Sequence, residues 1–454
     1  MSPRMRIVHH RRRSAVIGAA FCCVSALAGP GAQAQQAAMP QNVQHQEENG
    51  EMLKRRQAAI TGALTYNSDA NADLAGGADR GAAYLQRIGL IGDADLDRLI
   101  GWHGASAHVS VHFISGTGLS GSRVGNVLTV SGLEAEPAAR LFNLWVEQKL
   151  GARATLRVGQ FTAGQEFAIS PTAGLFVNST FGWPASFATD LPSGGPAYPL
   201  AAPGLRLAAM PGDGLTVRLA VFAGDPAGPG SGDPQRRDLH GFNGFRFAKR
   251  PFVIGEVSRS ASGDDPAWAL TLGGWMHTDS FDDLGLDDHG GSLAAPASTG
   301  IPLEHRGDLA VYAMADARLW KSGARALHGF MRASASPADR NPIDLYLDAG
   351  LSLAAPFRTR PGDTIGVGIA VARISPRLRS LLSERSAADG GPLDAPGFEG
   401  VVEATWQLKF GAHFYLQPNV QFVLHPAAAL LDGIAASRPP PNAVVLGLRT
   451  SLRL

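Results

Sequence analysis

The stretch Leu309–Trp320 has the sequence LAVYAMADARLW. Its odd positions carry only leucine, valine and alanine, whereas its even positions include tyrosine, aspartate and arginine. Successive side chains of a β-strand point to opposite faces, so this strand would have one face for an apolar medium and one for water. The alternation recurs at Leu215–Phe222, Leu345–Leu353, Ile365–Val371, Phe398–Lys409, Ala412–Leu424 and Val444–Leu454. It predicts an all-β protein.

Two architectures satisfy this alternation: a soluble sandwich with its apolar face inside, and a transmembrane antiparallel β-barrel with its apolar face outside. Short turns such as Lys149–Arg153 alternate with long Gly-, Pro- and Asp-rich loops at Ala223–Gly241, Asp279–Arg306 and Ser375–Gly397. Short turns on one side and long loops on the other are typical of membrane barrels. Aromatic residues also stand in the apolar rows, where interface girdles would form. The sequence therefore favours the barrel.

The N-terminus has the pattern of a signal peptide. Met1–Arg13 carries five arginines and no acid, Ala15–Ala28 is a short apolar stretch, and Ala32-Gln33-Ala34 is a cleavage site. We expect a signal peptide over 1–34, a polar N-terminal periplasmic segment over 35–60 and the barrel over 61–454. Losing 1–34 would remove both cysteines and five arginines, which changes the formal net charge from +1 to −4.

The sequence has few features of an enzyme or of a nucleic-acid partner. No basic stripe remains after the expected cleavage, and neither a nucleophile elbow nor an H-E-x-x-H motif is present. We expect no catalytic residues, no cofactor and no metal centre. Five aspartates in one loop leave calcium binding open, although their spacing misses the EF-hand register; they are Asp279, Asp282, Asp283, Asp287 and Asp288.

Several stretches resemble one family when they are taken in order. They are RLFNLWVEQ at 140–148, RVGQF at 157–161, FVNSTFGWP at 176–184, VFAGDP at 221–226, QPNVQ at 417–421 and NAVVLGLR at 442–449. Together they resemble the carbohydrate-selective porins (OprB type) of Gram-negative outer membranes. The chain departs from the family in two places: residues 35–60 replace a tryptophan- and glycine-rich stretch, and the last residue is Leu454 rather than phenylalanine.

The resemblance implies an outer-membrane barrel of about sixteen strands through which sugars, glucose above all, diffuse passively into the periplasm. It implies outer-membrane lipid and the barrel-assembly machinery as partners, and it leaves a homo-oligomer open. Two alternatives remain: an exported soluble β-sandwich that binds sugar, and a general porin without sugar preference. A barrel enzyme would need a nucleophile and base on the outer wall, and no such pair stands out.

The alternation also selects candidate pore-lining residues. On the strand Leu141–Leu150 it directs Asn143, Trp145, Glu147 and Lys149 inward, with Arg157 opposite, and it directs Phe142 outward. Paired charges would bond sugar hydroxyls and Trp145 would stack on a sugar face, although Glu147 and Arg157 could equally form a salt bridge within the wall. The long run Phe181–Gly204 suits a loop folded into the lumen, with Trp183 and Tyr198 as aromatic contacts. Asp348 points inward, so Asp348→Asn is expected to cost little.

Overall fold

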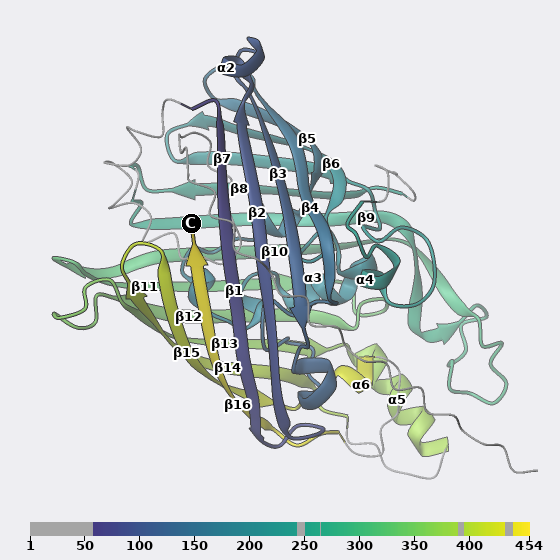
Figure 1. Ribbon diagram of the computed structural model, residues 1–454. Helices are drawn as coiled ribbons and strands as arrows, with labels where there is room; N and C mark the ends of the chain where they lie inside the picture. The colour runs from purple at the N-terminus through teal and green to yellow at the C-terminus, as the bar shows by residue number, and fades with distance from the viewer. Residues whose placement is uncertain (1–57, 243–249, 264, 389–394, 432–438) are drawn as a thin grey trace, which may run out of the picture.

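The computed structural model describes residues 58–242, 250–263, 265–388, 395–431 and 439–454. Within them, sixteen antiparallel strands form one closed barrel, in which each strand pairs with its neighbours in sequence and β16 pairs with β1 (Figure 1). The strands are β1 (Ile60–Ala75), β2 (Gly81–Asp95), β3 (Ala105–Gly116), β4 (Ala138–Lys149), β5 (Ala154–Phe161), β6 (Ala202–Gly212), β7 (Leu215–Phe222), β8 (Phe252–Ser260), β9 (Trp268–Asp287), β10 (Pro302–Ser322), β11 (Arg325–Ala335), β12 (Ile343–Ala354), β13 (Thr364–Ile374), β14 (Phe398–Phe410), β15 (Phe414–Leu424) and β16 (Ala443–Arg453). The predicted fold class is confirmed.

The two faces of the wall differ as the alternation predicts. In β10, Val311 is 60% exposed on the outside, whereas the next residue, Tyr312, is 4% exposed and points inward. The outer face carries leucine, valine, isoleucine and aromatic side chains on every strand pair, which is the composition of a surface that contacts lipid. The apolar medium is therefore outside the barrel, and a soluble sandwich is excluded.

The connections are short at one end of the barrel and long at the other. At the short-turn end, β6–β7 and β10–β11 are joined by two residues each, and the first and last strands also have their outer termini there. At the loop end, residues 162–201 and 375–397 are long excursions between strands. In membrane barrels short turns face the periplasm and long loops face the exterior.

The helices lie in these connections and are short. They are α2 (Leu96–Ile100), α3 (Ala185–Asp190), α4 (Pro234–Arg237), α5 (Pro376–Ala388) and α6 (Ala428–Leu431), with single turns at Ser120–Val124, Ala163–Gln165, Ala173–Leu175, Ser179–Phe181 and Pro192–Gly194. The Asp95 carboxylate caps α2 by accepting from the backbone N–H groups of Asp97 and Arg98 at 3.1 and 3.2 Å. None of the helices in the described residues is long and apolar enough to cross a membrane.

The aspartate-rich loop is shorter than predicted. We expected a loop over Asp279–Arg306, but β9 continues to Asp287 and β10 begins at Pro302. The Asp283 and Asp287 carboxylates cap backbone turns, because each accepts backbone N–H groups of the residues just after it. In the described part of the chain, no group of three or more His, Cys, Asp or Glu side chains is arranged to hold a metal ion.

Most of the two expected N-terminal segments lies outside the described residues. The signal peptide over 1–34 lies wholly outside the described residues, and so do residues 35–57 of the polar segment. The barrel begins one residue earlier than predicted, because Ile60 is the first residue of β1 and pairs with Ala94 of β2.

A charge on the outer face should destabilise the barrel. Leu347 on β12 and Ile369 on β13 are 43% and 47% exposed, and both point outward. We predict that Leu347→Arg or Ile369→Arg lowers the free energy of unfolding by ~2–4 kcal/mol, because lipid cannot solvate the guanidinium. Urea titration of the protein folded into liposomes measures the loss. The control is Ile301→Arg in the exposed 288–301 loop, which should change little. Equal effects at all three positions would contradict the facing assignment.

Candidate functional site

Two long connections at the loop end fold back into the barrel. They are residues 117–137, between β3 and β4, and residues 162–201, between β5 and β6. Leu128 of the first and Phe181 of the second belong to one buried apolar cluster with Tyr346 of β12, on the inner wall. An inward loop is present as predicted, but its bounds are 162–201 rather than Phe181–Gly204, because Ala202 begins β6; loop 117–137 is a second one that the sequence did not predict.

Two carboxylates on β14 bind the backbone of these loops. Glu399 accepts the N–H groups of Val127 and Leu128, with donor–acceptor distances of 2.8 and 2.6 Å, and it also accepts the N–H of Ala427 at 2.7 Å. Glu403 accepts the N–H groups of Val177 and Asn178, both at 2.8 Å. Both side chains are fully buried. Backbone groups inside a membrane barrel need such partners, so these carboxylates set where both loops lie.

A buried ion pair holds the middle of loop 162–201. Arg332 of β11 pairs with Asp348 of β12, and both side chains are 0% exposed. The same guanidinium donates to the carbonyl oxygens of Ala168 and Thr180, at 2.6 and 2.9 Å. The expectation that Asp348→Asn costs little is therefore wrong. Asp348 does point inward, but loop 162–201 covers it, so it faces a buried cation rather than a water-filled lumen.

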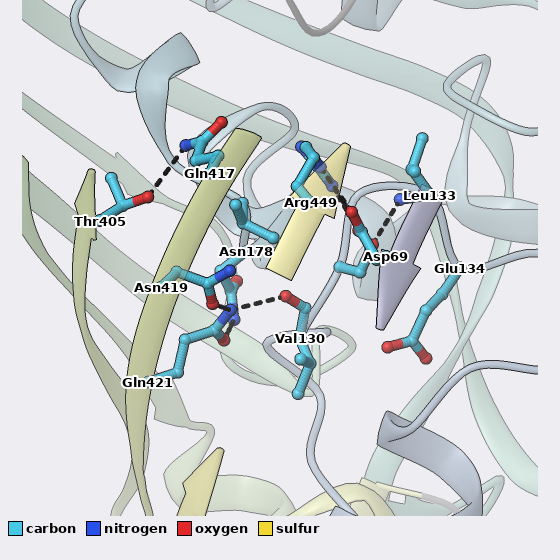
Figure 2. Close-up of polar contacts among 12 residues, drawn as sticks. Asp69, Val130, Leu133, Glu134, Asn178, Thr405, Gln417, Asn419, Gln421 and Arg449 are labelled. Atoms are coloured by element: carbon cyan, nitrogen blue, oxygen red, sulfur yellow. Dashed lines mark hydrogen bonds and ion pairs between the residues drawn. The ribbon is translucent and has the colours of Figure 1, made fainter. Parts of the chain in front are cut away.

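A second buried ion pair joins the first and last strands (Figure 2). Arg449 of β16 donates twice to the Asp69 carboxylate of β1, at 2.8 and 2.7 Å, and Ser131 of loop 117–137 contacts the same carboxylate. Beside this pair, the Asn178 side chain of loop 162–201 donates to Gln421 of β15 at 3.0 Å. The closing seam of the barrel therefore also holds the inward loops.

The inner wall formed by β1 to β4 gathers several buried polar atoms without hydrogen-bond partners in the part of the chain that the structure describes; such atoms also occur singly on β6, β9, β10, β14 and β15. Its buried side chains keep polar atoms for which the described residues provide no hydrogen-bond partner; they belong to Asn71 of β1, Arg87 of β2, Ser110 and His112 of β3, and Arg140 and Asn143 of β4. Buried polar groups normally have partners, and those left over are met by water or a ligand. We call this set the open wall. The set contains both donors and acceptors, and all of these atoms are buried.

Tyr198 of loop 162–201 faces the open wall. The Arg87 guanidinium lies 5.1 Å from the centroid of the Tyr198 ring, and the His112 ring lies 6.0 Å from it. The Tyr198 hydroxyl donates to the carbonyl oxygen of Leu133 at 3.1 Å, so loop 117–137 fixes the ring in place. The Tyr198 ring therefore packs directly against Arg87 and His112 of the open wall.

Two of the predicted residues on β4 have different surroundings. Asn143 donates to Gln165 at 3.2 Å and keeps its carbonyl oxygen without a partner in the described residues, as part of the open wall. Trp145 is 5% exposed; His108 stacks on its ring at 4.9 Å and the Arg157 guanidinium lies 3.7 Å from the ring centroid. A sugar could stack on this indole only if one of these two side chains moved.

The predicted charged residues form a closed network with two further side chains. Glu147 pairs with Arg157 at 2.9 Å and with Arg206 of β6 at 2.6 Å, and Glu166 pairs with the same two arginines. Two carboxylates thus neutralise two guanidinium groups, which favours the wall role over direct binding of a solute. Lys149 is exposed at the short-turn end of β4, outside this network.

Trp183 supports the inward loop. Its indole N–H donates to the carbonyl oxygen of Gly194 at 3.3 Å, and its ring meets the edge of Phe187 at 5.1 Å. Both partners belong to loop 162–201, so this contact shapes the loop itself. Of the two predicted aromatic contacts, only Tyr198 faces the open wall.

One residue points the opposite way from its prediction, and several were missed. Phe142 was assigned outward but is 2% exposed and stacks on His112 at 4.4 Å. The cause is a β-bulge, because Ser110 pairs with Asn143 whereas Val111 pairs with Leu141. The same bulge turns Arg140 inward, so alternation along β4 alone does not predict that Arg140 lines the interior. Arg87, in contrast, follows the ordinary alternation of β2. Ile88 is exposed on the outer face and the preceding Arg87 points inward, so the sequence pattern could have identified Arg87 as a lining residue.

We predict that Asp348→Asn destabilises the barrel by ~3–5 kcal/mol, because it leaves the Arg332 guanidinium buried without a counter-charge. Urea unfolding in liposomes again provides the measurement. The matched control is Asp344→Asn on the same strand, whose partner Arg373 is 49% exposed, so solvent screens that pair and the expected loss is below ~1 kcal/mol. A loss as small for Asp348→Asn would show that the buried pair does not support the fold.

The carboxyl of Glu134 should make loop 117–137 sensitive to pH. It accepts from the backbone N–H and hydroxyl of Ser120 at 3.1 and 3.0 Å, and burial raises its pKa from the ordinary 4.5 to about 7. A raised pKa means that the folded loop prefers the protonated acid. The stabilisation is complete below pH 4.5 and is lost as pH rises through about 7. Single-channel current noise in the parent should therefore increase between about pH 5 and about pH 8. Glu134→Gln, which stays neutral, should remove this increase; an unchanged increase would assign it to another group.

Three comparisons agree with this fold. The model of the carbohydrate-selective porin OprB family matches residues 79–454. Porin B of Pseudomonas aeruginosa is 22% identical over 414 residues, which are 85% of this chain and 86% of that protein. The high-pH structure of Pseudomonas putida OprB is similar with a TM-score of 0.77 at 21% identity, covering 89% of this chain and 96% of that one. Because the family model spans most of the sequence, the chain belongs to the OprB family of carbohydrate-selective porins, which are channels of the outer membrane rather than an enzyme family.

Proposed function

We propose that this porin admits glucose and similar neutral monosaccharides by passive diffusion, and that the sugar passes along the open wall beside Tyr198. The proposal rests on the unpartnered polar atoms of β1 to β4, because a sugar presents several hydroxyl groups that act as both donors and acceptors. A general porin would not need a buried row of such groups. Export by a cleaved signal peptide over 1–34 is part of the same proposal.

The residues divide into two roles under this proposal. Asn143 and Tyr198, together with Arg87 and His112, contact the solute, whereas Arg140 is buried and donates to the carbonyl oxygens of Asp238 and Gln235. Trp145, Glu147, Arg157 and Trp183 hold the strands and the inward loop in place, because each is already engaged by protein groups. Lys149 lies where the solute leaves, at the short-turn end.

The chemistry of the open wall suits weak, repeated binding. Each polar group offers one or two hydrogen bonds, and each is worth only about 0.5–1.5 kcal/mol net in competition with water. A solute that binds at several such positions in turn can still leave, which conduction requires. The Tyr198 ring adds an apolar face for the C–H groups of the sugar, next to the Arg87 guanidinium.

Sugar block of the ion current tests the proposal. In planar bilayers, Tyr198→Ala and Arg87→Gln should each weaken glucose block about fivefold, because each removes roughly 1 kcal/mol of contact. Trp145→Phe should bind glucose as the parent does if the ring only supports Arg157.

The matched control is Tyr84→Ala, because Tyr84 is 48% exposed on the outer face of β2 and should not contact the solute. Glucose block at the parental level in both Tyr198→Ala and Arg87→Gln would contradict the proposed path. Glucose flux without any saturable block would favour a general porin.

A further inference from the structure

The outer wall carries one feature that sugar passage does not use. A groove of about 560 Å³ lies on the outside of β11 to β16, and its apolar lining includes Leu351, Val367, Ala404, Trp406 and Val420. Ligand sites commonly have volumes of ~300–1,000 Å³. The groove therefore has the capacity of a binding site, and it opens toward the lipid rather than the lumen.

Side-chain size explains why the wall is hollow here. Ala404 of β14 lies between Val367 of β13 and Val420 of β15 in the register of the sheet. On the next strands, Leu351 of β12 pairs with Val367 and Leu446 of β16 pairs with Val420, and the leucine side chains are larger than those of the valines. Because the methyl group of Ala404 is flanked by larger side chains on both neighbouring strands, a hollow lies over β14 between them. Its shape suits a flexible hydrocarbon chain, which can follow an irregular apolar surface.

A polar hollow continues this groove at the short-turn end. The Trp406 indole N–H donates to Asp363 at 3.1 Å, and Asp363 lines a second hollow of about 420 Å³ together with Arg360 and Lys409. The two hollows therefore meet at this hydrogen bond. The short-turn end faces the periplasm, so this rim lies at the level of the inner leaflet headgroups.

The rim has the charge and the aromatic residues of a headgroup site. Residues 355–363 and 407–413 carry three cationic side chains, Arg358, Arg360 and Lys409, against the single acid Asp363. The Arg360 guanidinium lies 4.9 Å from the centroid of Phe410, which is 43% exposed on the outer face. Arg358 is exposed in the same turn. Basic clusters at the membrane surface attract anionic lipid.

We propose that this surface binds one anionic glycerophospholipid of the inner leaflet. One acyl chain occupies the apolar groove over Ala404, and the phosphate contacts Arg358 and Arg360 at the rim. A second copy of the chain is the competing occupant, but a net positive rim on both copies would repel across a symmetric contact. An anionic lipid complements the apolar groove and the rim at once.

Native mass spectrometry of the full detergent-solubilised barrel tests this proposal. Phosphatidylglycerol and phosphatidylcholine with identical acyl chains are the probes. The parent should retain one lipid and bind phosphatidylglycerol about fivefold more tightly than phosphatidylcholine. Ala404→Phe, which fills the groove, should weaken both lipids several-fold. Arg358→Gln should remove only the preference for phosphatidylglycerol.

Matched controls separate the site from the rest of the wall. Ala313→Phe makes the same change at an exposed outer position of β10, and Arg259→Gln removes an exposed arginine at the short-turn end of β8. Both should bind lipid as the parent does, and Ala404→Phe should conduct sugar as the parent does. The proposal would be overturned if Ala404→Phe bound lipid as tightly as the parent does. It would also be overturned if the parent formed a dimer that Ala404→Phe, and neither control variant, disrupted. If Ala404→Phe failed to fold, Arg358→Gln in the exposed turn would decide, because an unchanged lipid preference there also overturns it.

Discussion

Backbone hydrogen bonding inside the barrel is the constraint on which the rest of the structure depends. Irregular backbone at membrane depth is tolerated only where protein or water satisfies its N–H and C=O groups. Loops 117–137 and 162–201 meet this condition through wall side chains. Glu399 accepts N–H groups of the first loop, Glu403 accepts those of the second, and Arg332 donates to carbonyl oxygens of the second. The polar side chains on the inner face of the strands therefore bind the backbone of the loops, in addition to lining the interior of the barrel.

This use of the wall divides the barrel into two halves. On β11 to β16, most of the charged side chains that point inward bind the loops, as Arg332 and Asp348 do at 0% exposure, although Gln407 and Asn419 each keep one unpartnered atom in the described residues. On β1 to β4, polar atoms remain without partners in the described residues. A loop held firmly against one side necessarily displaces the free path toward the other. The position of the open wall thus follows from where the carboxylates of β14 are, and Tyr198 is placed by the same loop.

The fold was predictable because strand parity is a local property. Alternation identified the inward direction of Tyr346, Glu403 and Gln421 without any knowledge of their partners. It failed where pairing depends on the neighbouring strand: the bulge opposite Ser110 and Val111 turns Phe142 inward, and no pattern within β4 alone reveals it. The extension of β9 to Asp287 was missed for a related reason, because aspartates that cap turns resemble aspartates of an exposed loop.

The site was less predictable than the fold, because the open wall is defined by polar atoms that lack a hydrogen-bond partner among the residues that the structure describes. Glu147 and Arg157 were identified as candidates from sequence, yet Arg206 and Glu166 neutralise them from other segments of the chain. Arg87 and His112 have the same inward parity as those residues, but they keep unpartnered nitrogen atoms within the described structure. The difference lies in which loop reaches which strand. Such contacts join residues that are up to 318 positions apart, as between Ser131 and Arg449, so only the folded arrangement shows which inward charges the loops engage.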